Sequence, residues 1–299
     1  MTTDYLIRGT AANHTLRVLA VDSTTLVSET QQRHGLGVTA TAALGRLMTG
    51  AVLFAYTLTK HKESRVTLRI QGDGPIGYLV AEGTAQDNHA SARGYAHNPK
   101  VDLPLREIDQ KIDVGGLIGQ GDLSVTRILE NAEPYTSTVS LVSGEIAQDL
   151  AQYLAESEQI PSAVLLGVYL EGQEVRTAGG VLVQAMPEVS DGDLDILEAN
   201  VAGLGNLTSA LRDSDLQTVV ARITEGLDFE PLEDPVPVNF KCRCSRERLL
   251  ATLGYFSDSE RQDMIDSGGQ EAVCHWCNTT YQLTSTEIAD LQEKFRRLS

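Results

Sequence analysis

The apolar and polar positions of the first 185 residues alternate with two different periods. Residues 66–71 (VTLRIQ) alternate strictly, as a half-buried strand does, and residues 16–21 (LRVLAV) form a mostly apolar run. In QGDGPIG (71–77) an Asp-Gly pair precedes a proline, and an apolar run resumes at once, which predicts a hairpin. A second strand pair is expected from LSVT and YTSTVSLV, within residues 123–142.

Two segments of the same region carry the helical period instead. Residues 39–58 form one of them, and residues 145–156 form the other, with Ile146, Leu150 and Tyr153 on one face. These patterns predict that residues 1–186 form an α+β domain with mainly antiparallel strand pairing.

The pattern changes at Pro187. Apolar residues now recur at steps of three and four beside faces rich in Asp and Glu, which predicts two amphipathic helices interrupted by Gly203 and Gly205. The first series contains Leu194, Leu197, Val201, Leu204, Leu207 and Leu211, and the second contains Leu216, Val219, Val220, Ile223 and Leu227. Three prolines within residues 229–238 then end the helical structure.

The acidic charge is concentrated in this segment. The chain has 24 Lys and Arg against 41 Asp and Glu, and residues 187–237 alone hold twelve acidic residues against two arginines. A net charge of −17 excludes a dominant nucleic-acid partner, because such binding depends on clustered basic residues. The segment has two interpretations: an outer layer of the first domain, or a linker whose order depends on docking its apolar stripe.

The last segment, residues 238–299, predicts a small α+β domain. Ser245 is placed to cap the helix RERLLATLG, and the helix DSERQDMID ends at Gly268-Gly269. Thr284 and Glu287 form a capping box that opens the closing helix. The chain as a whole is thus predicted to contain a sheet domain (1–186), a helical acidic linker (187–237) and this C-terminal domain.

All four cysteines of the chain lie in the last segment. Cys242-x-Cys244 is followed by 29 residues and then by Cys274-x-x-Cys277. Two close pairs of thiolates are the ligand set of a structural tetrahedral Zn²⁺ site, so all four residues are predicted zinc ligands. His275, inside the second pair, is predicted to face solvent. A unit of about 60 residues has a marginal core, whereas structural zinc contributes on the order of 10–16 kcal/mol, so removal of the metal should unfold it.

The one-residue gap between Cys242 and Cys244 raises the question of redox chemistry. A disulfide between them would close a small strained ring and would be easily reduced again. The basic residues Lys241, Arg243, Arg246 and Arg248, together with the following helix N-terminus, favour the reactive thiolate form. The cluster is therefore predicted to be a reversible redox sensor; the alternative is a purely structural zinc ribbon with solubilising arginines.

The chain resembles the heat-shock protein 33 family of redox-regulated holdase chaperones. The resemblance is carried by FKCRCSRERLL (240–250) and VCHWCNTTYQLTSTEIADL (273–291), and upstream by QGDGPIG, RGYAHNP (93–99) and GEIAQDLAQYLAESEQIPSAVLLGV (144–168). It covers most of the chain, and the acidic segment 187–237 corresponds to the linker of the family.

The resemblance implies a mechanism. The reduced, zinc-bound protein would be an inactive monomer; oxidation would form Cys242–Cys244 and Cys274–Cys277 disulfides and release the zinc. The C-terminal domain would then unfold and the linker would lose its support. The apolar surface so exposed would bind unfolding client proteins and permit dimerisation, and clients would later pass to ATP-dependent chaperones. The protein itself would be neither an enzyme nor an ATPase.

Two other functions compete with this one. A zinc deaminase is suggested by His61-x-Glu63 with Cys274-x-x-Cys277, but Val273 stands where a proline is usual and two cysteines would go unused. A zinc-ribbon nucleic-acid module is the other, and it lacks a basic face, since residues 238–299 hold eight Lys or Arg against nine Asp or Glu.

Two features indicate a cytoplasmic location without a membrane partner. The N-terminal residues lack the features of a secretory signal, and free thiols suit a reducing compartment. The longest uncharged apolar stretch, 47–59, has 13 residues, fewer than the roughly 20 that cross a bilayer.

Overall fold

The computed structural model describes residues 3–58, 63–86, 88–130 and 132–298. The chain divides into two compact units, Met1–Lys241 and Cys242–Ser299, which are described separately. The boundary predicted at residue 238 lies inside a strand of the first unit, β11 (Val236–Phe240).

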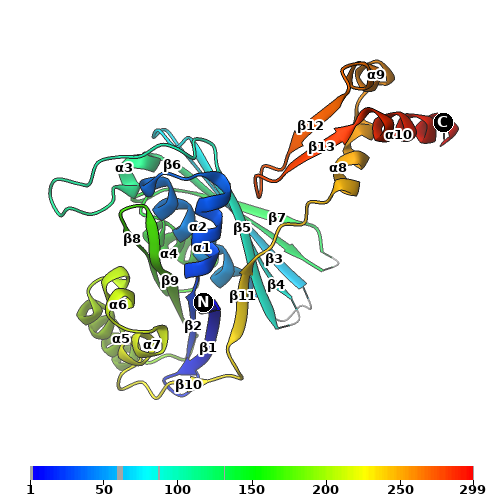
Figure 1. The fold of residues 1–299 in the computed structure, drawn as a ribbon. Helices are drawn as coiled ribbons and strands as arrows, with labels where there is room; N and C mark the ends of the chain where they lie inside the picture. Colours follow the sequence, from blue (N-terminus) through cyan, green and yellow to red (C-terminus); the bar gives the residue numbers. More distant parts are fainter. Residues whose placement is uncertain (1–2, 59–62, 87, 131, 299) are drawn as a thin grey trace. The chain divides into compact units, whose positions relative to one another are not determined.

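One large, mainly antiparallel sheet organises the first unit (Figure 1). Its order is β7-β6-β3-β4-β5-β11-β1-β2-β9-β8, and the short β10 pairs with β1. Among the described strands, β11 and β5 pair in parallel and the other pairs are antiparallel. The predicted α+β class with mainly antiparallel pairing is confirmed. The strand bounds are β1 Tyr5–Ala11, β2 Leu16–Asp22, β3 Glu63–Gly72, β4 Tyr78–Gln86, β5 His89–Ala96, β6 Gly121–Leu129, β7 Tyr135–Ser140, β8 Ser162–Glu171, β9 Glu174–Ala185 and β10 Glu230–Pro231.

Both predicted strand pairs are present. The turn at Gln71–Gly77 joins β3 to β4 in antiparallel register, and β6 pairs with β7. Along β3 buried positions alternate with partly exposed ones, as the sequence period requires. The helices of this region are α1 (Thr24–His34), α2 (Val38–Thr57), α3 (Val114–Ile118) and α4 (Ala147–Glu156).

Helix α2 is the centre of the main hydrophobic core. It is long and apolar enough to cross a membrane by composition, but 89% of its apolar window is buried inside the protein. It packs closely on β4 at Gly83, where a Cβ atom would lie 2.0 Å from the carbonyl oxygen of Ala51. The predicted helix at residues 39–58 is therefore a buried core helix, fixed on the sheet by a glycine contact that no larger residue permits.

The acidic segment packs on one face of β1, β2 and β9, and the main core around α2 packs on the other face (Figure 1). Leu19 and Val21 of β2 face the core around α2, whereas Val18 and Ala20 face the acidic helices, because successive residues of a strand point to opposite sides. This part of the sheet is thus covered on both faces.

The segment forms three helices, so the prediction of two is wrong. They are α5 (Asp191–Leu204), α6 (Leu207–Asp213) and α7 (Leu216–Ile223). The side chains of Asn206 and Asp215 accept hydrogen bonds from the backbone N–H groups of Ser209 and Thr218, at 2.8 and 2.7 Å. Asp215 therefore caps the helix that begins where the second predicted series begins, at Leu216, and Asn206 starts a separate helix just after the predicted interruption at Gly203 and Gly205.

The second unit is small and has little core. Its elements are α8 (Arg246–Thr252), a 3₁₀ turn (Leu253–Tyr255), α9 (Asp258–Asp266), β12 (Gly269–Val273), β13 (Thr280–Thr284) and α10 (Ser285–Leu298). Fully buried apolar side chains of its core are Leu253, Leu283 and Ile288. The predicted cap at Ser245 and the predicted capping box of Thr284 with Glu287 are both present.

The buried carboxylate of Asp4 makes a pH prediction possible. Its two oxygens accept hydrogen bonds from the backbone N–H groups of Thr25 and Leu26, at the start of α1, at 2.9 and 2.7 Å. The side chain is nevertheless so buried that the pKa of Asp4 rises from 3.8 to about 6. Because the folded state binds this proton more tightly, the contribution of Asp4 to stability is present below pH 4 and is lost as the pH rises through 6.

We therefore expect the free energy of unfolding of the wild type to fall, relative to that of Asp4→Asn, by up to about 1.4 kcal/mol per pH unit between pH 4 and 6. Urea denaturation at several pH values from 4 to 6 measures this difference in slope. The amide in Asp4→Asn has one acceptor oxygen fewer than the carboxylate, so the free energy of unfolding of the variant is lower at every pH. This offset does not depend on pH, so it does not affect the comparison of the two slopes. Parallel curves for the two proteins would contradict the prediction.

Candidate metal centre

Two short segments of the second unit present the four cysteines. Cys242 and Cys244 lie in extended chain directly before α8, and Cys274 and Cys277 lie in the turn that joins β12 to β13. The backbone N–H of Cys274 donates to the carbonyl of Thr279 at 3.0 Å, and that of Asn278 donates to the carbonyl of Cys274 at 2.7 Å. Asn278 has a φ of 56°, a left-handed conformation that asparagine tolerates well. The turn thereby brings its two thiols to the same end of the hairpin.

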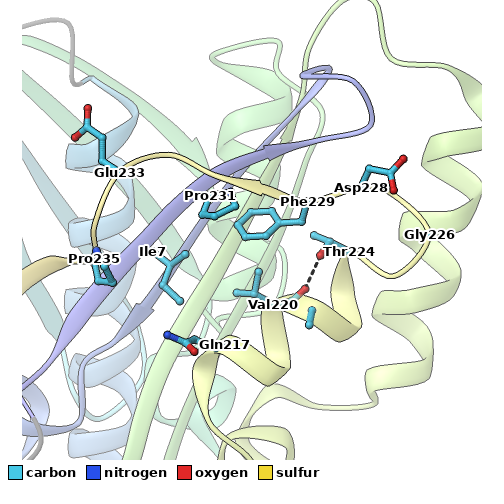
Figure 2. Close-up of a pocket in the computed structure, with 11 residues that line it drawn as sticks. Ile7, Gln217, Val220, Thr224, Gly226, Asp228, Phe229, Pro231, Glu233 and Pro235 are labelled. Carbon is cyan, nitrogen blue, oxygen red and sulfur yellow. Dashed lines mark hydrogen bonds between the residues drawn. The ribbon is translucent and has the colours of Figure 1, made fainter.

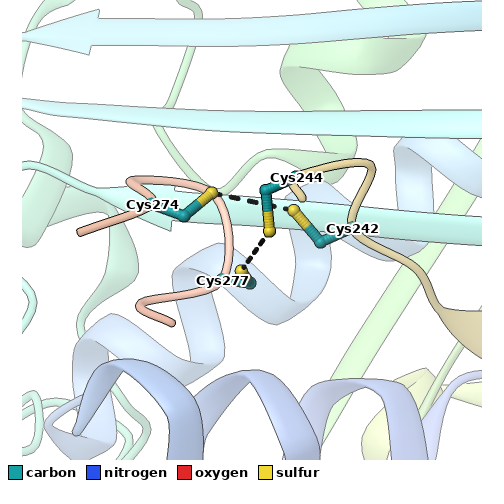
Figure 3. A group of neighbouring side chains, drawn as sticks. All are labelled: Cys242, Cys244, Cys274 and Cys277. Atoms are coloured by element: carbon teal, nitrogen blue, oxygen red, sulfur yellow. Dashed lines mark hydrogen bonds between the residues drawn. The ribbon is translucent and has the colours of Figure 1, made fainter. Parts of the chain in front are cut away.

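The four sulfur atoms form one compact cluster (Figure 3). All lie within 4.8 Å of one another; the Cys242 and Cys274 Sγ atoms are 3.8 Å apart, and those of Cys244 and Cys277 are 3.4 Å apart. Zinc–sulfur bonds of about 2.3 Å in a tetrahedron separate the sulfurs by about 3.8 Å. All four cysteines are free thiols. The site therefore fits a tetrahedral ion bound by four sulfurs.

Burial of the thiols makes their ionised form unfavourable, and a bound ion would have to offset this cost. Cys274 and Cys277 are buried, and Cys242 and Cys244 are half-buried. Burial raises the pKa of Cys244, and raises that of Cys274 to about 12. Four thiolates crowded into one buried place also repel one another. A divalent cation among them removes both penalties, since a coordinated thiol is held deprotonated.

Two of the basic residues predicted to favour thiolates, Arg246 and Arg248, contact other groups. The guanidinium of Arg246 donates to both carboxylate oxygens of Glu287, each at 2.7 Å, and holds the pKa of Glu287 at about 2. Arg248 donates to the backbone carbonyl of Arg243 at 2.7 Å, and Lys241 is exposed at the end of the first unit. Arg246 thus ties α8 to α10, and the influence of this group on the thiols stays a prediction.

Two hydroxyl groups reach the sulfurs and were not predicted from the sequence. The Tyr281 hydroxyl lies 3.2 Å from Cys244 Sγ, and Thr279 Oγ1 lies 3.2 Å from Cys277 Sγ. Both residues follow Cys277 within four positions, the only signal that the sequence offers for them. His275 is exposed, as predicted.

The residues of the deaminase alternative are spread over both units of the chain. His61 lies outside the described residues, and Glu63 begins β3 in the first unit. Cys242 and Cys244, which that signature would leave unused, are part of the same cluster as Cys274 and Cys277. The geometry therefore does not favour a deaminase.

Comparisons with known proteins agree with the resemblance seen in the sequence. Residues 4–284 match the family model described as Hsp33 protein. The chain is 51% identical over 289 residues to the 33 kDa chaperonin of Deinococcus radiodurans, covering 96% of this chain and 98% of that one. It is 48% identical over 301 residues to the 33 kDa chaperonin of Thermus thermophilus, covering 97% of this chain and 87% of that one.

A solved structure shows the same fold. The crystal structure of the 33 kDa chaperonin, a heat shock protein 33 homolog, from Thermotoga maritima superimposes with a TM-score of 0.90 at 38% sequence identity, over the full length of both chains. Family model, relatives and fold agree over nearly the whole chain, and together they show that this chain belongs to the Hsp33 family of chaperones.

Proposed function

We propose that this protein is a redox-regulated, ATP-independent holdase of the cytoplasm that protects unfolding proteins from aggregation under oxidative stress. The observation that carries the proposal is the gathering of four free thiols in a unit whose fully buried apolar core includes only Leu253, Leu283 and Ile288 among the described residues. A unit with so small a core depends on its thiol centre. No enzymatic activity is proposed.

Cys242, Cys244, Cys274 and Cys277 are the residues that would hold the metal ion, and zinc is the ion that best suits four thiolates. When bound, zinc supplies folding free energy by joining the segment before α8 to the β12–β13 turn. Four sulfurs would close the coordination shell of such an ion, so the site would have a structural role and would leave no position for a substrate.

Oxidation would remove this cross-link. We propose the pairing that the family resemblance implies, Cys242 with Cys244 and Cys274 with Cys277. Each pair of thiols loses two electrons and two protons as the S–S bond forms, and one molecule of hydrogen peroxide is reduced to two molecules of water. Each disulfide lies within its own segment, so no metal or disulfide cross-link then joins the two segments, and the unit of residues 242–299 unfolds.

The acidic linker, residues 187–237, is the proposed mobile part. Its apolar stripe covers one face of β1, β2 and β9, with Val219 and Ile223 fully buried. Strand β11 ends at Phe240, two residues before Cys242, so unfolding of the C-terminal domain begins directly beside the strand that follows the linker. Release of the linker would uncover apolar surface on itself and on the sheet of residues 1–186. This surface would bind clients and form the dimer, and clients would later pass to ATP-dependent chaperones.

A pocket that is partly open to solvent lies where the linker meets β1 (Figure 2). It has a volume of about 690 Å³ and is lined by Ile7 of β1, Val220 of α7, Thr224 at the end of that helix and Phe229 of the following loop. Part of the contact between the linker and the sheet is thus accessible to water while the linker is docked.

The first prediction concerns activity. Zinc-free protein oxidised with peroxide should suppress the light scattering of a heat-denatured client at near-stoichiometric ratios, because its apolar surfaces are exposed. The reduced, zinc-loaded protein should not. The assay compares the two forms of the same preparation, and the proposed function fails if they protect the client equally.

The second prediction concerns the metal alone. Chelation of zinc under reducing conditions should raise the hydrogen exchange of residues 242–299 to the level of an unfolded chain, since little else holds this unit. The core around α2 should keep its slow exchange and serves as the internal control. Protection that persists in α8–α10 after complete removal of zinc would show that the metal does not support the fold.

The third prediction concerns the linker. Ile223→Ala should weaken docking by about 2–5 kcal/mol, since it removes a fully buried side chain, and should give the reduced, zinc-loaded protein measurable client protection. Ile196→Ala is the matched control, because Ile196 lies in α5 of the same segment but is 40% exposed. Limited proteolysis of residues 187–237 monitors release. Faster cleavage without client protection would contradict the proposed role of the linker.

A further inference from the structure

The pocket between the linker and β1 is a space that the proposed function leaves unused (Figure 2). Among its lining residues, Ile7 belongs to β1 and the others belong to the linker, residues 187–237. The linker contributes them from α7, from the turn that follows this helix, and from residues 231–235. The walls of the pocket are therefore in place only while the linker is docked on the sheet.

The walls are apolar and fixed. Ile7 and Val220 belong to the hydrophobic core under the linker and are 8% and 2% exposed. The ring of Phe229 lies against β1 at Gly9, where a Cβ atom would be 2.3 Å from Cε2 of the ring. The absence of a side chain at Gly9 thus allows this close approach. The volume of about 690 Å³ is within the range of small-molecule sites, about 300–1,000 Å³.

The rim of the pocket is acidic. Asp228 and Glu233 lie at opposite ends of the group of lining residues (Figure 2). The Glu233 carboxylate pairs with the guanidinium of Arg8, which offsets its charge. Asp228 is exposed and takes part in no ion pair within the described part of the chain. Residues 225–234 contain five acidic residues and no basic one. An apolar space with such a rim suits a ligand that joins an apolar body to a positive charge.

We propose that this pocket binds a small amphipathic cation, an aliphatic or aromatic amine whose apolar body fills the space between Ile7, Val220 and Phe229 and whose ammonium group lies at Asp228. An ammonium group has three donors and no acceptor, so a carboxylate is a suitable partner for it. A carboxylate ligand of the same shape would place a second negative charge beside Asp228. An uncharged ligand would gain the apolar contacts but no ion pair.

Such a ligand would oppose release of the linker. A molecule that binds one state of a protein and not the other favours the bound state by a factor of 1 + [L]/Kd. Among the lining residues the docked linker supplies all except Ile7, so the undocked state has no site. The amine would therefore raise the threshold at which the holdase is activated. This last consequence rests on the proposed function, whereas binding and its effect on the linker do not.

The binding experiment uses reduced, zinc-loaded, full-length protein and three probes of similar shape: 4-phenylbutylamine, 4-phenylbutanol and 4-phenylbutyrate. A ligand-observed NMR titration gives the Kd of each. We expect a Kd of about 1 mM for the amine, the affinity that so small a molecule reaches in an apolar pocket. The Kd of the alcohol should be about threefold higher, since it lacks the exposed ion pair, and the carboxylate should show no saturable binding.

Asp228→Asn tests the position of the charge. The amide keeps the shape of the rim without its charge, so the amine and the alcohol should bind this variant equally. Asp228 has a φ of 48°, and asparagine adopts this left-handed conformation readily, so the turn is kept. Asp195→Asn is the matched control, because Asp195 is exposed in α5 of the same linker and does not line the pocket.

Ala221→Trp tests the space. Ala221 is an exposed residue of α7 that lines the pocket, so a large ring there fills the opening without replacing a buried side chain. Binding of the amine should be lost in this variant. Should Ala221→Trp fail to fold, Asp228→Asn decides the location of the site, because it changes no volume.

Hydrogen exchange of α7 in the reduced protein measures the effect on the linker. With the amine at ten times its Kd, exchange through undocking should slow about tenfold. Exchange in α4, which does not line the pocket, should not change and is the internal control. After peroxide treatment, the same amine concentration should delay client protection by the wild type. The amine should have no such effect on Ala221→Trp, which controls for a direct action of the amine on the client.

Each outcome decides a separate claim. No saturable binding of the amine, or amine binding that persists in folded Ala221→Trp, overturns the site. Equal binding of the three probes, or an amine preference that survives in Asp228→Asn, overturns the class of ligand. Binding that leaves α7 exchange unchanged overturns the coupling to the linker, and slowed exchange without delayed client protection overturns the regulation. If peroxide-treated wild type protects no client in the absence of amine, the proposed function fails, and the binding and exchange results still decide the site.

Discussion

The convergence of four sulfurs from two segments is the interaction on which the C-terminal unit depends. Its apolar core is small, and its other tertiary ties are capping boxes and partly exposed ion pairs such as Arg246 with Glu287. Exposed ion pairs and caps contribute about 1 kcal/mol each or less. A bound ion is worth several times their sum. With the proposed zinc bound, the stability of the unit would be concentrated in this one polar centre.

The first unit, in contrast, is stabilised by extensive hydrophobic cores. Two hydrophobic cores lie on either side of β1, β2 and β9, and one of them is completed by the acidic linker. The linker buries its apolar stripe and turns its carboxylates outward, so the sequence that lets it dock would also keep it soluble after the proposed release. The charge at residues 187–237 opposes compaction by self-repulsion. Docking of residues 187–237 is favoured by burial of their apolar side chains and opposed by repulsion among their carboxylates. The burial of α2 is not opposed by any such repulsion.

The sequence predicts features whose causes are local. The helices α2 and α4, the hairpin at 71–77 and the caps at Ser245 and Thr284 each follow from a few adjacent residues, and the thiol cluster follows from cysteine spacing. Contacts that depend on tertiary register were not predictable. Tyr281 reaches Cys244 only because β12 and β13 pair in one particular register. The caps at Asn206 and Asp215 were missed although they are local, since each side chain accepts from a backbone N–H only three residues further along.

Strand β11 has a consequence for how the chain is made. The strands β7-β6-β3-β4-β5 and β1-β2-β9-β8 form two antiparallel groups, and in the described sheet β11 is the strand that joins them, pairing with β5 on one side and with β1 on the other. Its residues come after all the others of the sheet in the sequence. During synthesis both groups leave the ribosome first, and their inner edges stay unpaired until residue 240 has emerged. A nascent chain of this protein thus carries two open strand edges until late in translation, the kind of edge that invites mispairing.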